Sequence, residues 1–265
     1  MYLRPVHTEH DLKIIYEFIQ SNPLGVITTG IKSDNYPFLQ SSHIPWVLDL
    51  PPHTPEGTPS TEENKLLGTL RGHVARANPQ AKAMIESVAS LPIPTEGGVK
   101  LEQEVLILFT SPHQQHYVTP KFYTTTKPST GKVVPTWNYA AVQVYGTLTL
   151  YHDSKSPQTE DFLRKLLNDL TKLAEEDVMG YDGEEGREKA WTVAEAPESY
   201  VGLLKKAIVG VEVRIDRVEG KWKMSQELAE GDREGTIKGF KELGTWKGDE
   251  IARTVEERAR RKDEK

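Results

Sequence analysis

Residues 131–150 of the chain, GKVVPTWNYAAVQVYGTLTL, hold the pattern that decides the fold. Apolar and polar residues alternate over the second half of this stretch, which is the period of a half-buried β-strand. Lys132 follows a glycine, and a Val-Val-Pro segment then leads to Thr136, Trp137 and Asn138 at the mouth of the strand. A charge, a hydroxyl, an indole and an amide at that position suit a flat anionic ligand. The alternative is a turn with a core tryptophan whose N–H finds a carbonyl.

Period-2 patterns recur along the rest of the chain. They predict further strands at 24–29, 38–48, 65–75, 104–110 and 208–216, and the first two of these form a hairpin around a DNYP turn. A loop with several polar and aromatic residues is expected over 112–130. The segment GKWKMSQ at 220–226 is compatible with an extension of the sheet.

Helix starts are marked by capping residues and prolines. Thr8 is the predicted cap of a first helix, Asn78 precedes a proline that opens a second, and Ser156 precedes the proline that opens the longest helix. A short helix near Pro197 and two charged helices at the end complete the set. Strict β-α-β alternation is absent and period-2 patterning dominates. The sequence therefore predicts an α+β fold, with a mostly antiparallel sheet or barrel and helices packed outside it.

Composition excludes several classes of protein and site. The 265 residues include no cysteine, so disulfides, thiolate catalysis and thiolate metal sites are excluded. The net charge of −6 does not favour a primary nucleic-acid binder, whose phosphate contacts need clustered Lys and Arg. No apolar run approaches membrane-spanning length and the first residues do not resemble a secretory or transit signal, so a cytoplasmic location is expected.

A second candidate site is LRGHVARANP at 70–79. Arg71 and His73 lie two residues apart and therefore share one face of a strand, and Arg76 and Asn78 follow at a helix start, where free N–H groups attract phosphate. The alternative is a solvent-facing strand followed by an ordinary helix cap.

Two weaker candidate sites lie in QSSHIPW (40–46) and GKWKMSQ (220–226). Ser42 and His43 offer a hydroxyl and an imidazole on a strand that is otherwise apolar, but polar residues on a half-exposed strand are common. The second segment interleaves lysines with Trp222, which suits a flavin edge or an edge strand protected by lysine. His113 and His116 lack a metal-ligand pattern, and no nucleophile elbow, dinucleotide fingerprint or Walker motif is present.

Taken together, these blocks resemble the PaiB-like family of FMN-binding proteins. The matching stretches run in order over residues 1–240, and LRGHVARANP and KVVPTWNY are the most specific. The resemblance implies a split β-barrel of the pyridoxamine-phosphate-oxidase-like type, a homodimer, and FMN in a cleft between the subunits. The FMN contacts it implies are Ser42, His43, Arg71, His73, Arg76, Asn78, Lys132, Thr136, Trp137, Asn138, Lys221, Trp222 and Ser225, with the last three forming an arm from the partner subunit.

The chain departs from the family pattern in three places, one of which is Phe122, where the family often has Trp before Tyr123. Its loop PHQQHY is two residues longer than the family's, so either His113 or His116 can correspond to the family histidine. Residues 49–63, rich in Pro, Thr and Glu, are expected to form a surface insertion in a domain spanning 1–245, and 246–265 to form a charged C-terminal helix or tail.

Three functions remain open at this stage. The first is an FMN-dependent oxidoreductase in which the flavin supplies the redox chemistry and the protein binds and tunes it. The second is a flavin-linked transcriptional regulator, although DNA binding is doubtful for an acidic chain without a helix-turn-helix pattern. The third is haem binding or haem degradation, with His43, His73, His113 or His116 as the iron ligand.

Overall fold

The computed structural model describes residues 1–50, 67–92 and 97–263. Apart from its first two residues, the predicted insertion at 49–63 lies outside the described residues. No helix in the described part of the chain is both long enough and apolar enough to cross a membrane.

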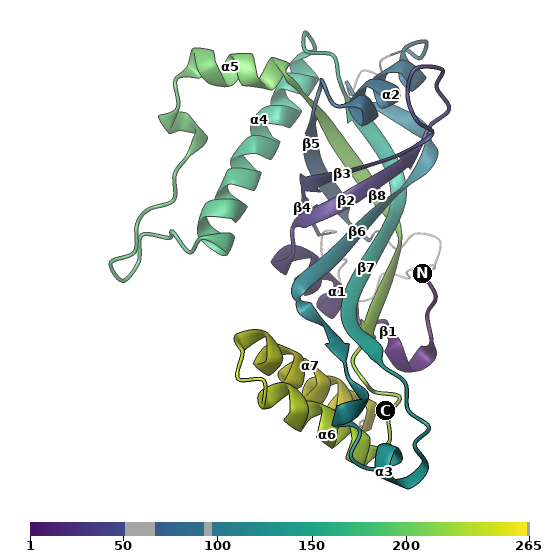
Figure 1. Cartoon of the computed structure of the whole chain (residues 1–265). Coiled ribbons are helices and arrows are strands. Elements are labelled where there is room, and N and C mark those ends of the chain that lie inside the picture. Colours follow the sequence, from purple (N-terminus) through teal and green to yellow (C-terminus); the bar gives the residue numbers. More distant parts are fainter. Residues whose placement is uncertain (51–66, 93–96, 264–265) are drawn as a thin grey trace, which may run out of the picture. The chain divides into compact units, whose positions relative to one another are not determined.

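Eight strands form one sheet, drawn in Figure 1. The order along the sheet is β3-β2-β6-β7-β8-β5-β4, and β1 pairs with β8 outside that path. The pairings of β1 with β8, β2 with β3 and β6, and β5 with β4 and β8 are all antiparallel. The strands are β1 (Thr8–Glu9), β2 (Leu24–Gly30), β3 (Leu39–Pro45), β4 (Val47–Asp49), β5 (Thr69–Ala75), β6 (Val99–Val118), β7 (Thr136–Tyr151) and β8 (Ile208–Lys223).

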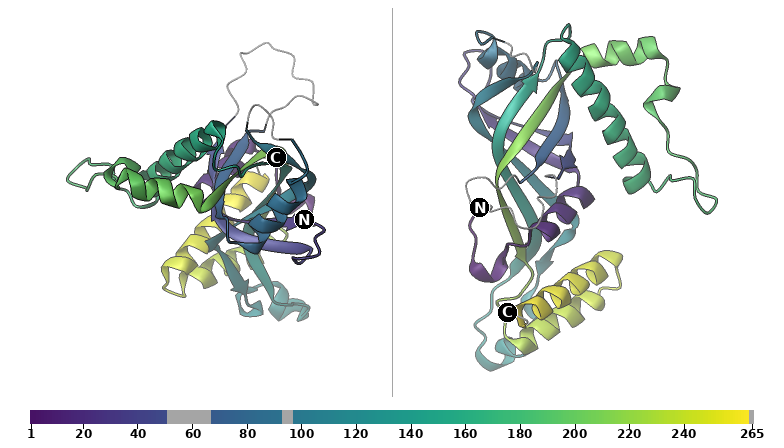
Figure 2. Two further views of the ribbon diagram at one scale, coloured as in Figure 1. Left: turned by 90° about the horizontal axis from the view of Figure 1, so that it is seen from above. Right: turned by 180° about the vertical axis from the view of Figure 1, so that it is seen from behind.

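Seven α-helices accompany the described strands. They are α1 (Leu12–Ser21), α2 (Pro79–Val88), α3 (Thr126–Thr130), α4 (Pro157–Lys172), α5 (Glu198–Lys206), α6 (Glu230–Lys241) and α7 (Trp246–Asp263). In both views of Figure 2, α6 and α7 lie side by side, in agreement with their extensive mutual contact. Short helical turns occur at Pro5–His7, Pro120–Phe122, Leu173–Val178 and Val193–Glu195.

The chain divides into two compact units. A barrel unit contains residues 19–108 and 144–218, and a terminal unit contains residues 1–18, 109–143 and 219–265. In the barrel unit, the two end strands β3 and β4 are separated only by Trp46, which is 1% exposed, so one bent segment contributes to both ends of the sheet. Alternate residues of β7 and β8, among them Val144, Leu148 and Val211, are fully buried and form the barrel core.

The structure confirms the expected fold class, an α+β protein with a mostly antiparallel split β-barrel and peripheral helices. The predicted hairpin is the β2–β3 pair, whose register runs from Leu24 opposite Pro45 to Gly30 opposite Leu39. Asn78 caps α2 as expected, because its side-chain oxygen accepts the Gln80 N–H at 2.8 Å.

Three expectations about individual elements were wrong. The loop predicted from residue 112 begins only after Val118, because the polar residues of PHQQHY continue the alternation of β6. Thr8 lies in β1 instead of capping α1, and the first turn of that helix is capped by Asp11, which accepts the Lys13 N–H at 2.9 Å. The longest helix is α7, since α4 gives way to a π-helical turn after Lys172.

Candidate functional site

The residues predicted to hold the ligand fall into two groups, one in each compact unit. The barrel group is Ser42, His43, Arg71, His73, Arg76 and Asn78. The terminal group is Lys132, Thr136, Trp137, Asn138, Lys221, Trp222 and Ser225.

A cavity of about 360 Å³ lies in the terminal unit at the start of β7. Its walls bring together segments that are far apart in the sequence: the N-terminal segment, the turn after β6, the loop before β7 and the end of β8. The lining residues are Arg4, Tyr123, Thr126, Lys132, Val133, Val134, Pro135, Thr136, Lys223, Glu227, Leu228 and Asp232.

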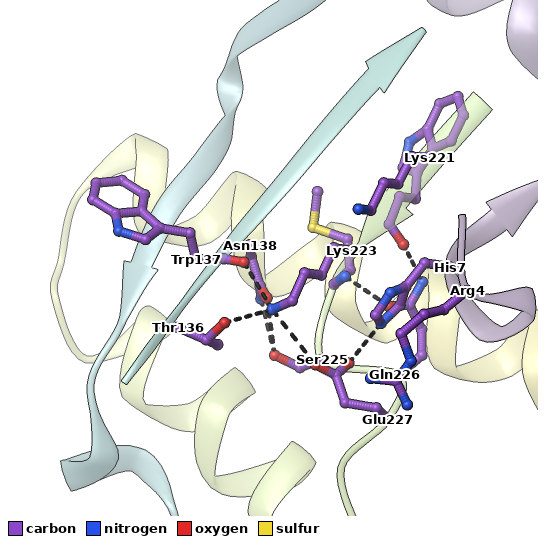
Figure 3. Close-up of polar contacts among 12 residues, drawn as sticks. Arg4, His7, Thr136, Trp137, Asn138, Lys221, Lys223, Ser225, Gln226 and Glu227 are labelled. Carbon is purple, nitrogen blue, oxygen red and sulfur yellow. Dashed lines mark hydrogen bonds and ion pairs between the residues drawn. The ribbon is translucent and has the colours of Figure 1, made fainter. Parts of the chain in front are cut away.

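Lys223 organises one wall of this cavity (Figure 3). Its ammonium group donates to the Thr136 hydroxyl at 2.7 Å and to the Trp137 carbonyl at 2.9 Å, so it fixes the first two residues of β7. It also lies 3.5 Å from a carboxylate oxygen of Glu227. The other oxygen of Glu227 is 3.0 Å from Nε2 of the buried His7.

Glu227 is a negative charge held between two basic groups. Burial of this carboxyl raises its pKa, but the hydrogen bond with His7, a backbone N–H and the charge of Lys223 outweigh that effect, so the pKa lies below its ordinary value. Glu227 is therefore ionised at neutral pH and neutralises Lys223. The positive charge available to a ligand in this cavity has to come from other residues.

Arg4 and Lys132 supply that charge. Both side chains are exposed, both line the cavity, and within the described residues neither makes an ion pair or a side-chain hydrogen bond. Trp137 follows Thr136 on β7 but does not line the cavity, and its side chain points away from Lys223 in Figure 3. Its indole is 58% accessible and meets the Tyr117 ring edge-on at 6.0 Å between centroids. The two cations of the cavity suit an anionic group, and the indole offers a separate apolar surface on the same strand.

Asn138 and Ser225 lie next to the cavity but pair with each other. The Asn138 amide nitrogen donates to the Ser225 hydroxyl at 3.0 Å, and the same hydroxyl lies 3.2 Å from the amide oxygen. Both residues are at most 1% exposed, and Ser225 has a left-handed backbone with a φ of 62°. Their polar atoms therefore join β7 to the turn after β8, as Figure 3 shows.

The side chains of Lys221 and Trp222 also have contact partners within the terminal unit. The Lys221 ammonium donates to the Tyr2 carbonyl at 2.9 Å and lies 5.2 Å from the Tyr139 ring centre. Trp222 is 3% exposed and packs edge-to-face on Phe18 at 5.1 Å. These contacts are made within the chain itself.

In the barrel group, Arg71 is enclosed by acids. Its guanidinium makes a bidentate contact with Asp49 and donates to Asp169 at 2.8 Å, while its side chain is 6% exposed. The hydrogen bond with Asp49 is the main reason that the pKa of Arg71 lies above its ordinary value. Nη1 is the one nitrogen of this guanidinium that is buried without a partner among the described residues.

The other barrel residues lie around the start of α2. Arg76 donates to the His152 carbonyl at 2.7 Å, and Asn78 donates to the Ser42 hydroxyl at 2.9 Å beside a shallow hollow. His43 is exposed on β3. His73 is half-buried on β5, and this burial lowers its pKa below the ordinary value.

Several cavity residues were not selected from the sequence. Arg4 and Glu227 stand in short segments without a spacing signal. The contact of Glu227 with the buried His7 joins residues 220 positions apart in the chain. Lys223 stands two residues after the selected Lys221, so strand periodicity places both on one face, but periodicity does not tell which lysine reaches the cavity.

Comparison with known proteins identifies the family. Residues 1–217 match the family described as "Putative FMN-binding domain", so the chain belongs to that family, and FMN is the cofactor that membership gives it. The chain is 56% identical over 268 residues to the uncharacterized protein AFUA_5G13800 of Aspergillus fumigatus, and the match covers all of both chains. It is 22% identical over 232 residues to the protease synthase and sporulation protein PAI 2 of Bacillus subtilis, covering 88% of this chain and 85% of that protein. The resemblance to PaiB-like proteins is thereby confirmed.

Two solved structures share similarity with this chain. The conserved hypothetical protein Rv2991 of Mycobacterium tuberculosis gives a TM-score of 0.45 at 13% identity, covering 87% of this chain and 95% of that one. A pyridoxamine 5′-phosphate oxidase-related, FMN binding protein of Nostoc punctiforme gives a TM-score of 0.35 at 9% identity, covering 83% and 86%.

Proposed function

We propose that this chain is a dimeric flavoprotein that holds FMN at the cavity beside β7 and uses it as an oxidoreductase. The observation that carries the proposal is the pair of exposed cations, Arg4 and Lys132, that line a cavity at the start of β7, the strand that also carries the accessible indole of Trp137. FMN has a phosphate at one end and a flat aromatic ring system at the other. We assign the phosphate to the two cations and the ring system to the indole.

The phosphate end suits the cations. The guanidinium of Arg4 offers a planar fork that can bind two phosphate oxygens, and Lys132 adds a mobile point charge. The Thr126 and Thr136 hydroxyls line the same cavity. Because Glu227 already neutralises Lys223, Arg4 and Lys132 supply the positive charge for the ligand, partly offset by the Asp232 carboxylate in the same lining.

The aromatic end suits Trp137. An indole that is more than half exposed presents a large apolar surface to water, and such surfaces commonly mark ligand or subunit contacts. Stacking of the isoalloxazine on this indole would bury it, and a second copy of the chain would cover the rest. This supports the homodimer with FMN between its subunits.

Five other predicted contact residues do not bind FMN at this cavity in the proposal, or bind it only in part. Asn138, Ser225, Lys221 and Trp222 hold the strands that frame the cavity, because their polar atoms and rings have partners within the chain. Arg71 keeps one unpartnered nitrogen for a ligand, although its charge is already balanced by two carboxylates.

Bound FMN would supply hydride and electron transfer, for which the side chains of this protein have no equivalent. The chain's own residues bind and orient it. Of the alternatives, neither regulation through DNA contact nor haem binding gains support. The net charge is −6. His113 and His116 pack on the rings of Trp246 and Phe240, and none of the four candidate histidines, His43 and His73 included, lines the cavity at the start of β7.

The proposal is tested by titrating purified protein with FMN and following the quenching of flavin fluorescence. Lys132→Ala removes a charge-assisted phosphate contact, so Kd should rise about 10- to 100-fold. Lys127→Ala removes an equally exposed lysine of α3 that does not line the cavity, and should leave Kd within about twofold. Equal Kd values for the two variants, or no FMN binding by the unaltered protein, would contradict the proposal.

A further inference from the structure

Helix α6 lies beyond residues 1–217, the part of the chain that matches the FMN-binding family. We propose that α6 is nevertheless a working part of the cofactor site, with Asp232 as a positioning residue that sets the place of Lys132. This inference rests on the proposed function, because it assumes that Lys132 contacts the FMN phosphate.

Asp232 is a buried carboxylate that holds the N-terminus of α3. One of its oxygens accepts hydrogen bonds from the Thr125 N–H at 2.8 Å, the Thr125 hydroxyl at 2.7 Å and the Thr126 N–H at 3.1 Å. The residue is 3% exposed. Burial opposes its ionisation, but the threonine donors outweigh burial and lower the pKa to about 2. The N-terminus of a helix, where backbone N–H groups lack partners within the helix, also stabilises the negative charge of Asp232.

The other end of α3 leads directly to Lys132. Gly131 adopts a left-handed conformation with a φ of 66°, and its N–H bonds the Lys127 carbonyl at 3.1 Å. The Lys132 N–H then bonds the Thr130 hydroxyl at 3.1 Å. The five-residue helix α3, about 7.5 Å long at 1.5 Å per residue, therefore connects the segment bound by Asp232 to the segment that carries Lys132. Because both ends of this helix are fixed by hydrogen bonds, a displacement at Asp232 shifts Lys132.

Helix α6 packs closely against residues 122–125, the segment that precedes α3. A Cβ atom added at Gly235 would lie 2.2 Å from the Phe122 carbonyl oxygen, and one added at Gly239 would lie 2.2 Å from the Phe122 ring. A side chain at Gly235 would displace the backbone of one of the two segments, and a side chain at Gly239 would displace the helix or the Phe122 ring. The Thr124 hydroxyl also donates to the Gly231 carbonyl at 2.8 Å. The place of Asp232 is therefore fixed by the packing of α6.

The sign of the effect distinguishes positioning from simple electrostatics. Asp232 lines the cavity, so its negative charge by itself opposes the binding of a phosphate. If charge alone mattered, neutralising Asp232 would strengthen FMN binding. If Asp232 positions Lys132, neutralising it weakens FMN binding, because α3 loses its anchor.

The test compares FMN with riboflavin, which lacks the phosphate. Asp232→Ala should raise the Kd for FMN about tenfold and leave the Kd for riboflavin unchanged, and Asp232→Asn should show a smaller loss of the same sign. Asp249→Ala, which removes an exposed aspartate from the first turn of α7, is the matched control and should change neither value. Equal losses for both ligands, or tighter FMN binding, would overturn the positioning role. If the alanine variant does not fold, the isosteric asparagine variant decides between the same outcomes.

A double-mutant cycle separates this inference from the proposed function. Asp232→Ala should add little to the loss already caused by Lys132→Ala, because both act on one contact. Additive losses would overturn the coupling. An effect of Lys132→Ala without an effect of Asp232→Ala overturns the positioning role alone. A Lys132→Ala variant that binds FMN normally overturns the proposed function and the positioning role with it.

Discussion

Replacing Arg71 by methionine should destabilise the protein through the loss of a buried ion cluster. The substitution keeps most of the apolar length of the side chain and removes three charge-assisted hydrogen bonds, two to Asp49 and one to Asp169. Such bonds are worth about 1.5–3 kcal/mol each, but removing a buried guanidinium also removes its desolvation cost. Asp49 and Asp169 are 42% and 34% exposed and regain water. We therefore expect the free energy of unfolding to fall by about 2–3 kcal/mol.

The measurement is urea unfolding followed by circular dichroism without FMN, so that ligand binding does not contribute to stability. Arg214→Met is the control, because that arginine forms an exposed pair with Asp216 that should be worth at most about 1 kcal/mol. Asp169 sets the pH dependence that we expect. Burial raises the pKa of Asp169. The hydrogen bonds from Lys165 and Arg71 lower it by more, so the pKa lies below its ordinary value of 3.8.

A carboxyl whose pKa is lower in the folded state stabilises the protein above the unfolded pKa, and this stabilisation is lost as the pH falls through the folded value. The difference between the unaltered protein and Arg71→Met should therefore be full at pH 7 and shrink below about pH 3.8. A loss no larger than that of Arg214→Met, or a loss that persists unchanged at pH 3, would refute the reasoning.

Two further stability predictions concern buried groups. Trp46→Ala should lower the free energy of unfolding by about 3–5 kcal/mol in the same assay, because the indole is 1% exposed where β3 meets β4, whereas Trp191→Ala should cost under about 1 kcal/mol at a 44% exposed position. Asn138→Ala should cost about 1–3 kcal/mol by leaving the Ser225 hydroxyl without its buried partner. Removing both side chains with Asn138→Ala and Ser225→Ala should cost less than the sum of the two single losses.

Local patterns were enough to predict much of the fold. The β2–β3 hairpin and the Asn78 cap depend on residues that are close in sequence, so alternation and a cap before proline reveal them. The end of β6 was not predicted, because its polar residues indicated a loop from residue 112. In the structure these residues continue the alternating pattern of the strand to Val118. The length of a strand depends on which neighbours pair with it, and single-sequence periodicity does not contain that information.

The candidate site could be predicted only in part for a similar reason. Lys132, Thr136 and Trp137 stand in one short motif, so their chemistry is visible together. Arg4 and Glu227 reach the same cavity from opposite ends of the chain, and no spacing rule connects them to β7. The sequence also does not show that Asn138 is paired with Ser225, because that pairing follows from tertiary packing 87 residues apart.

A crystal structure of the protein with FMN tests the central claim most directly. We predict a two-copy assembly in which the FMN phosphate lies within hydrogen-bond distance of Arg4 and Lys132 and the ring system lies against Trp137. FMN bound elsewhere, with these two cations in open solvent, would contradict it.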